Sequence, residues 1–427
     1  MKRVLLISPN FVPLNAADSQ RVRMSLSYFK DFGWEAEVVC VDEKYSDLPK
    51  DELLVQSIPT DCIIHKVEAF SKKWTAKFGL GSLALRSLWF YQKKVMLLLQ
   101  AKNYDLIYFS TTEFPVCILG NLWKKRFGVP YVIDMQDAWH SIYYQNKPKK
   151  ERPKKYWFSY RLHKYLEPLA MNNCDGLISV SQAYLDTLQQ RYPQLKQKPT
   201  ALIPFGAFEK DFEIAKKNVE TCPVVSLSHQ KINVVYIGRG GADLQFSVEL
   251  FFRAIKEALQ TEPELFSRLH FYFIGTSYAP KAQAKQSIYP IAQKFNLENQ
   301  VTEITDRIGF YNTINTLLAA DALFLPGSND SEYSASKIYL YLLSEKPLLA
   351  IINPESPIKK ILEEYGAKNV YTYNQTSTLD VTEFLKKLIQ NKFSQEKYNT
   401  IAVNKYAAKS MTLKQCLLFN QVIDGKI

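Results

Sequence analysis

The chain has 427 residues, of which 54 are Lys or Arg and 42 are Asp or Glu, so its formal net charge is +12. With 47% hydrophobic and 22% charged residues it has the composition of a packed globular protein, which excludes a disordered chain or a fibre. A single hydrophobic core stops growing at roughly 250–300 residues, so the length predicts two domains.

The six cysteines are widely spaced, without a CxxC pair or a His at ligand spacing, so we interpret them as buried thiols in a reducing cytosol and expect no metal site. The N-terminal apolar run is shorter than the ~7–15 residues of a signal-peptide core. No stretch reaches the ~18 apolar residues of a membrane span. These observations predict a soluble, cytoplasmic protein whose basic excess requires a partner.

The first half of the chain alternates short apolar runs with stretches of helical periodicity. Strands are expected at Val4–Ser8, Glu37–Val41, Leu106–Phe109, Tyr131–Ile133 and Gly176–Val180, and helices over Ser19–Phe32 and Val116–Arg126. Apolar strands that alternate with helices predict a parallel sheet covered on both faces.

The pattern breaks in a polar stretch between Gly206 and Lys231 and then restarts. Further strands are expected at Ile232–Ile237, His270–Ile274 and Ala322–Leu325, with helices over Leu250–Leu259 and from Ser336. We therefore predict an α/β chain of two doubly wound, Rossmann-like domains, over residues 1–205 and 231–408. Residues 206–230 are expected to link them, and residues 409–427 to form a final helix.

A glycine cluster follows the strand Ile232–Ile237. Gly238, Gly240 and Gly241 allow the backbone to approach a ligand, and Arg239 can offer a bidentate fork to phosphate. The cluster is neither a Walker loop nor a complete GxGxxG motif. The alternative is a tight turn with a surface arginine.

The segment Pro326–Pro347 carries polar residues after a buried strand. Ser336 and Lys337 are expected in the first turn of a helix, where free N–H groups and the lysine favour a diphosphate. Glu332 can accept hydrogen bonds from sugar hydroxyls. An N-capped helix after a solvated loop is the alternative.

At this point the sequence resembles a GT-B glycosyltransferase of the retaining family 4 type. The resemblance covers most of the chain and depends on the order and spacing of segments more than on any single motif. These segments are ISPNFVPLNAADSQRVRMSLSYFKDFGWEAEVVCVD, YDLIYFSTTEFP, PYVIDMQDAWH, CDGLISVSQAYLDTL, IPFGAF, VVYIGRGGADL, LHFYFIGTSYAP, LLAADALFLPG and EYSASKIYLYLLSEKPLLA.

The resemblance implies two Rossmann-like domains facing across a cleft that closes, with an acceptor on the N-terminal domain and a nucleotide-sugar donor on the C-terminal one. It implies metal-independent transfer with retention, no cofactor, and a last helix around Leu413–Ile423 that crosses back to the first domain. Arg239 matches a basic residue that contacts the donor diphosphate. Glu332 matches the first glutamate of the Glu-x7-Glu element, and Ser336 and Lys337 match the helix start that faces the diphosphate.

Three positions depart from the family pattern. The second glutamate of the element is Leu340, the lysine five residues after the arginine is Leu244, and the N-terminal double glycine is Ala16-Ala17. The donor base and sugar are therefore left open. Lys337 is a candidate to replace the missing lysine.

A second group of candidates follows the strand Tyr131–Ile133. Asp134 and Asp137 are spaced to share a face, and His140 titrates near neutrality in its ordinary state. Asp137 matches a carboxylate of the family loop that faces donor sugar and acceptor, where it would orient the acceptor or stabilise oxocarbenium-like charge. For Asp134 a strand-end cap is the alternative, and for His140 a structural role is preferred over that of a base.

The loop after the first strand supplies the remaining acceptor-site candidates, which are Ala17, Asp18 and Arg21. Arg21 has the strongest case, because a residue at the start of the following helix reaches the carboxyl edge of a parallel sheet.

Two stretches combine basic and aromatic residues, one between Ser141 and Tyr165 and one between Lys72 and Lys94. Both fall in the expected acceptor domain. Lysines with interfacial aromatics suit an anionic membrane surface, so peripheral binding at the inner face of a membrane is predicted. Nucleic acid is not expected, because no nucleic-acid motif accompanies them. A solvated helix face is the alternative.

The sequence thus predicts transfer of a sugar from a nucleotide sugar to a saccharide or lipid-linked acceptor, in surface polysaccharide or glycoconjugate assembly. Two other functions remain open. One is a nucleotide-sugar epimerase of the same fold, and the other is a catalytically weak glycosyltransferase-like binding subunit, for which Leu244 and Leu340 argue.

Overall fold

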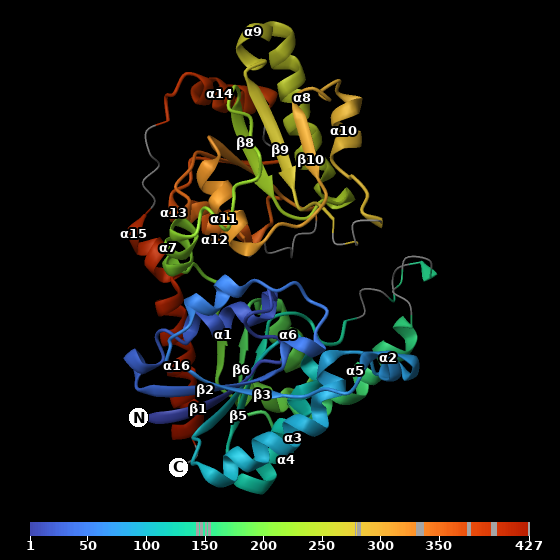
Figure 1. Ribbon diagram of the computed structural model, residues 1–427, viewed down its shortest axis with the longest axis vertical. Helices are drawn as coiled ribbons and strands as arrows, with labels where there is room; N and C mark the ends of the chain where they lie inside the picture. Colours follow the sequence, from blue (N-terminus) through green and yellow to red (C-terminus); the bar gives the residue numbers. More distant parts are fainter. Residues whose placement is uncertain are drawn as a thin grey trace. The chain divides into compact units, whose positions relative to one another are not determined.

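The computed structural model describes residues 1–141, 145, 148–149, 152, 155–277, 279, 283–329, 337–373, 377–393 and 399–425. The chain divides into two compact units (Figure 1). Unit 1 comprises Met1–Gly206 and Tyr406–Ile427, and unit 2 comprises Ala207–Lys405. No helix among the described residues is long and apolar enough to cross a membrane.

Unit 1 contains a seven-stranded parallel sheet in the order β3-β2-β1-β4-β5-β6-β7. Its strands are β1 Lys2–Ile7, β2 Trp34–Val41, β3 Ile63–Val67, β4 Leu106–Ser110, β5 Tyr131–Met135, β6 Gly176–Ser179 and β7 Thr200–Leu202. Its helices are α1 Gln20–Ser25, α2 Lys72–Thr75, α3 Leu83–Ala101, α4 Ile118–Phe127, α5 Tyr156–Met171, α6 Gln182–Arg191 and α16 Ala408–Asp424.

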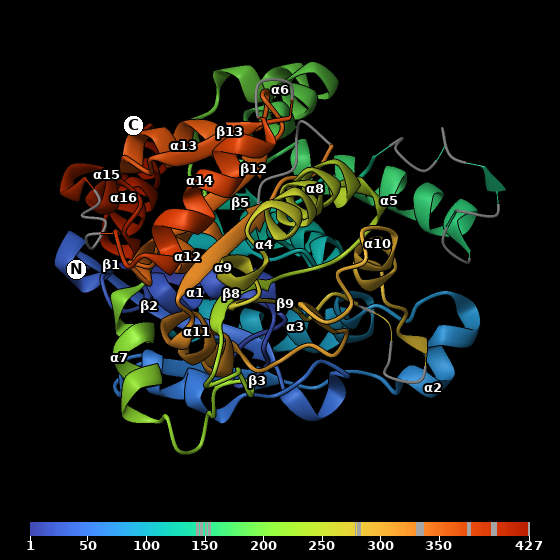
Figure 2. The ribbon, with the colours of Figure 1, turned by 90° about the horizontal axis from the view of Figure 1, so that it is seen from above.

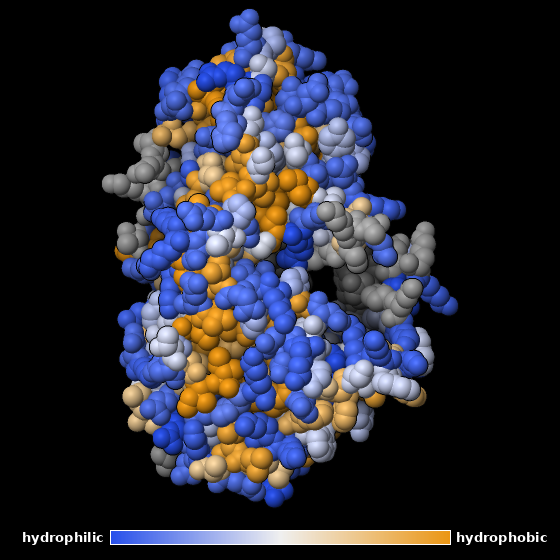
Figure 3. Space-filling model, viewed as in Figure 1, coloured by the Kyte–Doolittle hydropathy of each residue, from blue (hydrophilic) through white to orange (hydrophobic). Residues whose placement is uncertain are grey.

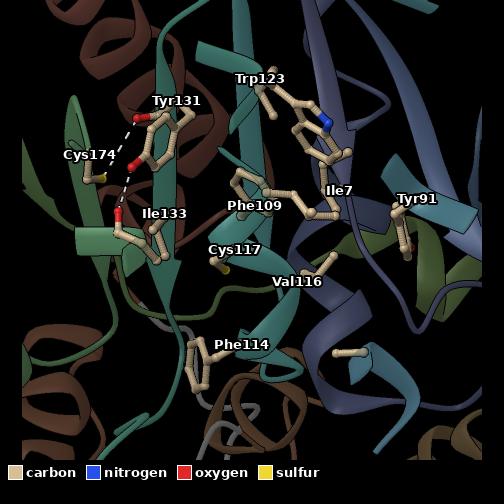
Figure 4. Packing of buried hydrophobic residues seen from close by; sticks show 14 of the residues in the cluster. Ile7, Tyr91, Phe109, Phe114, Val116, Cys117, Trp123, Tyr131, Ile133 and Cys174 are labelled. Atoms are coloured by element: carbon tan, nitrogen blue, oxygen red, sulfur yellow. Dashed lines mark hydrogen bonds between the residues drawn. The ribbon is translucent and has the colours of Figure 1, made fainter. Parts of the chain in front are cut away.

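Alternate residues of these strands enter two hydrophobic layers, because successive side chains of a strand point to opposite faces. Ile7, Phe109 and Ile133 pack on the α3–α4 side, where the Phe109 ring stacks on Trp123 with centroids 5.9 Å apart (Figure 4). In the same layer the Cys174 thiol lies 3.8 Å from the Tyr131 carbonyl oxygen. Tyr108 faces the other way and meets Phe419 of α16 at 5.0 Å.

The helix α16 belongs to unit 1 although it follows the whole of unit 2 in sequence. Phe419 contacts Trp34 at 5.4 Å, and Gln415 Nε2 donates a buried 2.8 Å hydrogen bond to Ser25 Oγ. The sequence places this helix around Leu413–Ile423, and the structure has it over Ala408–Asp424.

Unit 2 contains a six-stranded parallel sheet in the order β10-β9-β8-β11-β12-β13. Its strands are β8 Ile232–Ile237, β9 Leu269–Ile274, β10 Val301–Ile304, β11 Ala322–Pro326, β12 Leu348–Ile352 and β13 Asn369–Thr372. Its helices are α7 Glu209–Lys217, α8 Gln245–Thr261, α9 Pro263–Phe266, α10 Tyr289–Lys294, α11 Phe310–Ala319, α12 Ile338–Leu343, α13 Pro357–Tyr365, α14 Thr378–Ile389 and α15 Thr400–Lys405.

Helices cover both faces of this second sheet. Figures 1 and 2 show α8 on one side of β8 and α11 on the other. On the α8 side, Phe251 stacks on Phe324 of β11 at 4.1 Å and meets Phe271 of β9 edge-on at 5.2 Å. The doubly wound, Rossmann-like architecture predicted for both halves is therefore confirmed.

The interval 206–230 differs from the linker that the sequence predicts. Its residues from Ala207 belong to unit 2, and they include α7, which packs on α11. Asp211 is buried and accepts a 3.3 Å hydrogen bond from the Tyr311 hydroxyl, and Asn315 Nδ2 donates to the carbonyl oxygen of Cys222 at 2.9 Å. These contacts fasten the polar stretch to the unit that follows it.

Candidate functional site

The candidate residues of each unit follow the carboxyl ends of its strands, where open α/β sheets bind ligands. The strand order reverses between β8 and β11 in unit 2, and between β1 and β4 in unit 1. Loops on either side of such a switch point diverge and leave a crevice. The loops after β8 and β11 are those that carry Arg239 and Lys337.

The glycine loop after β8 is held against the loop after β9. Gly238 N donates to the Ile274 carbonyl at 2.9 Å, and Gly240 N donates to the Thr276 carbonyl at 2.7 Å. A Cβ on Gly240 would lie 2.1 Å from Ser287 Oγ and 3.2 Å from the Thr276 carbonyl oxygen. Gly241 has φ +144°, a conformation that L side chains rarely adopt. Both glycines are thus required by the path of the loop.

Arg239 forms a bidentate pair with Asp243 in the short turn Ala242–Leu244 that leads into α8. Nη1 lies 2.8 Å from Oδ1 and Nη2 lies 2.6 Å from Oδ2. Ser328, which follows β11, donates its hydroxyl to Asp243 Oδ2 at 2.6 Å. Burial alone would raise the pKa of Asp243, but the bonds from Arg239 and Ser328 outweigh it and lower that pKa. The ionised carboxylate joins the loops of the two strands that flank the switch point.

Lys337 lies directly before α12. It therefore precedes the helix, whereas the sequence predicts it within the first turn. It is mostly buried, and no described residue accepts a hydrogen bond from it or pairs with it. Burial, followed by the charge of Arg307 after β10, lowers the pKa of Lys337 to about 8. A desolvated ammonium beside a second cation favours the binding of an anion.

The two residues that replace the lysine and the second glutamate of the family pattern are apolar. Leu244 is 1% exposed and packs in the core of unit 2. Leu340, in place of the second glutamate, is half-buried on α12. Neither position can supply a polar group to a ligand, so Lys337 is the residue of these three that carries charge to the switch-point edge.

In unit 1, Arg21 and Asp134 form a buried ion pair at the carboxyl edge of the sheet. Arg21 Nε lies 2.6 Å from Asp134 Oδ2, and neither side chain has solvent exposure. Arg21 Nη2 also donates to the Ile203 carbonyl at 2.6 Å, and its guanidinium lies 5.2 Å from the ring of Phe205. This geometry fits residues that hold the loops of the edge in place.

Asp134 is the centre of a larger polar network. The hydroxyls of Tyr108 and Ser110 donate to its Oδ2 at 3.1 and 3.0 Å, and Gln136 Nε2 donates at 2.9 Å. Gln136 is itself buried, and its Oε1 has no hydrogen-bond partner among the described residues. Gln136 stands between the two aspartates in the chain but was not among the residues predicted from the sequence.

Asp18 is buried at the same edge, next to the switch point between β1 and β4. Its Oδ2 accepts hydrogen bonds from Thr111 Oγ1 at 3.0 Å and from Thr112 N at 3.2 Å. Burial raises the pKa of Asp18 despite these bonds. Burial likewise raises the pKa of Glu113, and the neighbouring charge of Asp18 adds to that effect. Two carboxyl groups that favour protonation are thus close to one another.

Three further candidates in unit 1 differ in exposure. Asp137 and Ala17 are exposed, and Asp137 Oδ1 caps the N–H of Ala138 at 2.7 Å. The His140 ring packs 4.5 Å from that of Tyr160, and its Nε2 is buried without a partner among the described residues. Burial, followed by the charges of Arg191, Lys164 and His163, lowers the pKa of His140 to about 4. His140 is therefore neutral at pH 7.

Glu332 and Ser336, predicted at the donor sugar and diphosphate, lie outside the described residues. Asp243 and Ser328 are site residues that the sequence analysis missed. The signal for Asp243 was its position four residues after Arg239 at a helix start, which is the spacing of an ion pair. No comparable signal marked Ser328.

Comparisons with known proteins agree with this architecture. Residues 26–207 match the model described as Glycosyltransferase Family 4. No curated protein matches the chain at a significant level.

Several solved structures share the fold over the full length of both chains. TarM of S. aureus, solved with UDP, has a TM-score of 0.57 at 10% identity and covers 98% of this chain and 100% of its own. HepE of Anabaena, solved in complex with UDP, has a TM-score of 0.53 at 16% identity, with 100% and 99% covered. The N-terminal domain of Candida albicans trehalose-6-phosphate phosphatase reaches 0.56 at 13% identity, with 100% and 96% covered.

At these identities the structural likeness shows the fold alone. The family model matches residues 26–207, nearly all of which lie in unit 1. Residues 26–207 thus resemble Glycosyltransferase Family 4, and the chain as a whole shares the two-domain GT-B fold of these solved structures.

Proposed function

We propose that the chain transfers a sugar from a nucleotide-sugar donor to a saccharide or lipid-linked acceptor, with retention of configuration and without a metal. Unit 2 binds the donor, and unit 1 binds the acceptor at the edge that carries Asp18, Asp134 and Asp137. A place in surface polysaccharide or glycoconjugate assembly is part of this proposal.

One observation carries the donor assignment. Arg239 and Lys337 follow β8 and β11, the two strands that flank the switch point of unit 2. The first is held in a defined position by Asp243, and the second is a mostly buried cation without a described partner. Negative charge develops on the leaving diphosphate during glycosyl transfer, and preorganised cations stabilise it. Structures of HepE in complex with UDP and with UDP-glucose support a nucleotide sugar as the donor class.

The catalytic carboxylate that we propose is Asp137. It is exposed at the carboxyl end of β5, whereas Asp134 is buried in an ion pair and holds the network around it. Glu332 and Ser336 stay proposals for the donor sugar and diphosphate. Ala17 and His140 stay proposals for the acceptor side, His140 as a neutral ring.

Thermal unfolding with UDP, GDP, ADP and CMP sugars tests the donor class, because a ligand that binds only the folded state raises the melting temperature. We expect one nucleotide series to raise it and its sugar to be released slowly to water. Nuclear magnetic resonance of the first-formed anomer then tests retention. The absence of any shift with all four series would contradict the proposal.

A second candidate function is that of a binding subunit with weak transfer activity. It is favoured by the buried Leu244 and the half-buried Leu340, which stand where the family pattern has polar residues. It predicts nucleotide-sugar binding without sugar release in the presence of any acceptor extract. An epimerase would instead convert the donor sugar with no acceptor, which product analysis of the same reactions distinguishes.

A further inference from the structure

Six aromatic side chains among the described residues of unit 1 are exposed to solvent, although rings of this size are mostly buried in globular proteins. They are between 50% and 73% exposed and comprise Phe70, Trp74, Phe78, Trp89, Trp157 and Tyr165. Basic residues alternate with them. We call these residues together the basic aromatic surface, and its cations are Lys72, Lys73, Lys77, Lys93, Lys94, Arg161 and Lys164.

The segments that carry this surface adjoin one another. The ring of Phe70 lies 6.5 Å from that of Trp89 and 5.0 Å from that of Phe90, both on α3. The turn after α2 meets the start of α5, because a Cβ on Gly79 would lie 2.6 Å from the Phe158 ring. Lys155 Nζ donates to the Ala76 carbonyl at 3.1 Å across the same junction.

The surface is anchored from beneath by a buried arginine. Arg86 Nη1 donates to the Phe70 carbonyl at 2.8 Å, and Nη2 donates to the Tyr45 carbonyl at 2.8 Å. Since Arg86 is itself 4% exposed, it ties the loop before α2 to the body of α3. The exposed rings are therefore held on an ordered scaffold.

Carboxylates are nearly absent from the surface. The stretch from Lys72 to Ala101 contains six Lys or Arg residues and no Asp or Glu. Within it, Lys72 pairs with Asp47, whereas no described carboxylate pairs with Lys73, Lys77, Lys93 or Lys94. The one acid of α5, Glu167, is buried against Arg191. The surface thus presents uncompensated positive charge.

Cations and rings are paired on it. Lys77 Nζ lies 4.9 Å from the Trp74 ring, Lys93 Nζ lies 5.5 Å from Trp89, and the Arg161 guanidinium lies 5.6 Å from Trp157. Over the part labelled α2 and α5 in Figure 1, Figure 3 shows hydrophilic residues mixed with residues of intermediate hydropathy. Tryptophan rings prefer the headgroup level of a bilayer, and lysines beside them contact anionic headgroups.

We propose that the basic aromatic surface docks on an anionic lipid bilayer, with its rings at the headgroup level and its lysines against the lipid phosphates. Two observations favour a bilayer over a nucleic acid. Six of the seven cations are lysines, which act as point charges, and the exposed rings include three tryptophans, the typical residue of a membrane interface. The proposal is independent of the donor chemistry of unit 2.

Sedimentation of the full chain with sucrose-loaded vesicles tests the proposal. Phosphatidylcholine vesicles with 30% phosphatidylglycerol are expected to bind it, pure phosphatidylcholine much less, and added salt to weaken the binding. Because each cation near such a surface adds favourable energy, Lys73→Glu with Lys77→Glu should weaken partitioning by roughly tenfold or more. Trp74→Ala with Phe78→Ala should weaken vesicle partitioning by a similar factor. The salt dependence of binding should stay as steep as that of the wild-type chain, since the charges remain.

Matched controls come from unit 2. Lys360 and Lys392 are exposed there, and so are Leu379 and Ile401. Lys360→Glu with Lys392→Glu, and Leu379→Ala with Ile401→Ala, should leave vesicle binding unchanged. Three outcomes would each overturn the proposal. The control variants could lose as much vesicle binding as the variants of the surface, or the chain could bind neutral vesicles as well as anionic ones. The chain could also bind a duplex oligonucleotide tightly, with that binding abolished by Lys73→Glu and Lys77→Glu.

Discussion

Arg239 and Asp243 are joined by two parallel hydrogen bonds of 2.8 and 2.6 Å, so the fork that would meet a diphosphate is held by a carboxylate. Asp243 also accepts from Ser328, and its carbonyl accepts the N–H of Asn329 at 2.9 Å. The pair therefore does two things. It fixes the guanidinium at the switch-point edge, and it binds the loop after β8 to the loop after β11.

The first prediction concerns that pair. Asp243→Ala should lower the free energy of unfolding of unit 2 by about 1–2 kcal/mol, because the hydrogen bonds are charge-assisted but partly open to solvent. Arg239→Ala should cost a similar amount, and the double variant less than the sum. Amide hydrogen exchange in α8 and β11 measures this. All six tryptophans lie in unit 1, so the tryptophan fluorescence transition should stay in place and serves as the control.

The second prediction concerns the buried ion pair of unit 1. Asp134→Ala should cost about 3–5 kcal/mol, because it leaves the Arg21 guanidinium buried and unpaired. Urea unfolding followed by tryptophan fluorescence measures it. Arg21→Met with Asp134→Leu should cost less than Asp134→Ala alone. Asp61→Ala, whose partner Lys30 is exposed, should leave the midpoint unchanged, and an equal shift there would contradict the argument.

The third prediction follows from the lowered pKa of His140. Between its ordinary value of 6.5 and about 4, the unfolded chain binds a proton that the folded chain does not. Unit 1 should therefore lose stability as the pH falls through this window. The urea midpoint by tryptophan fluorescence should depend less on pH in His140→Gln. The matched variant His270→Gln, in unit 2, should show the same pH dependence of this urea midpoint as the wild-type chain.

The sequence predicted the sheets better than the helices, for a physical reason. Strands buried on both faces, such as β4, are continuous apolar runs, whereas β3 at the edge, with Ile63 exposed, has no such pattern and was missed. The strands β7, β10, β12 and β13 were not predicted either, although β12 is an apolar run that is fully buried. A helix was expected over Ser19–Phe32, but α1 ends at Ser25. Phe29 keeps the helical spacing of apolar residues because its ring packs on Phe419 from the other end of the chain, at 6.2 Å.

The candidate site, too, could be predicted from the sequence only in part. Strand ends followed by Arg239, Asp134 and Asp18 could be read from the sequence, since a parallel sheet brings such loops to one edge. The sequence could not show that Arg21 and Asp134 neutralise one another, because the pairing joins positions 113 residues apart in the chain, from 21 to 134. Nor could it show that Leu244 is enclosed in the core.

The last prediction concerns Lys337, whose pKa is lowered to about 8 by burial and by Arg307. Below pH 8 the free protein carries the ammonium, and above it the amine is neutral, so the affinity for a nucleotide diphosphate should fall as the pH rises from 7.5 to 9.5. Calorimetric titration with UDP measures this. Lys337→Arg should keep its charge and flatten the profile, and Lys337→Ala should bind weakly at every pH. Lys346 is a matched control, because burial also lowers its pKa but it lies before β12, at the opposite edge of the sheet. A pH profile altered by Lys346→Ala and not by Lys337→Ala would remove Lys337 from the donor site.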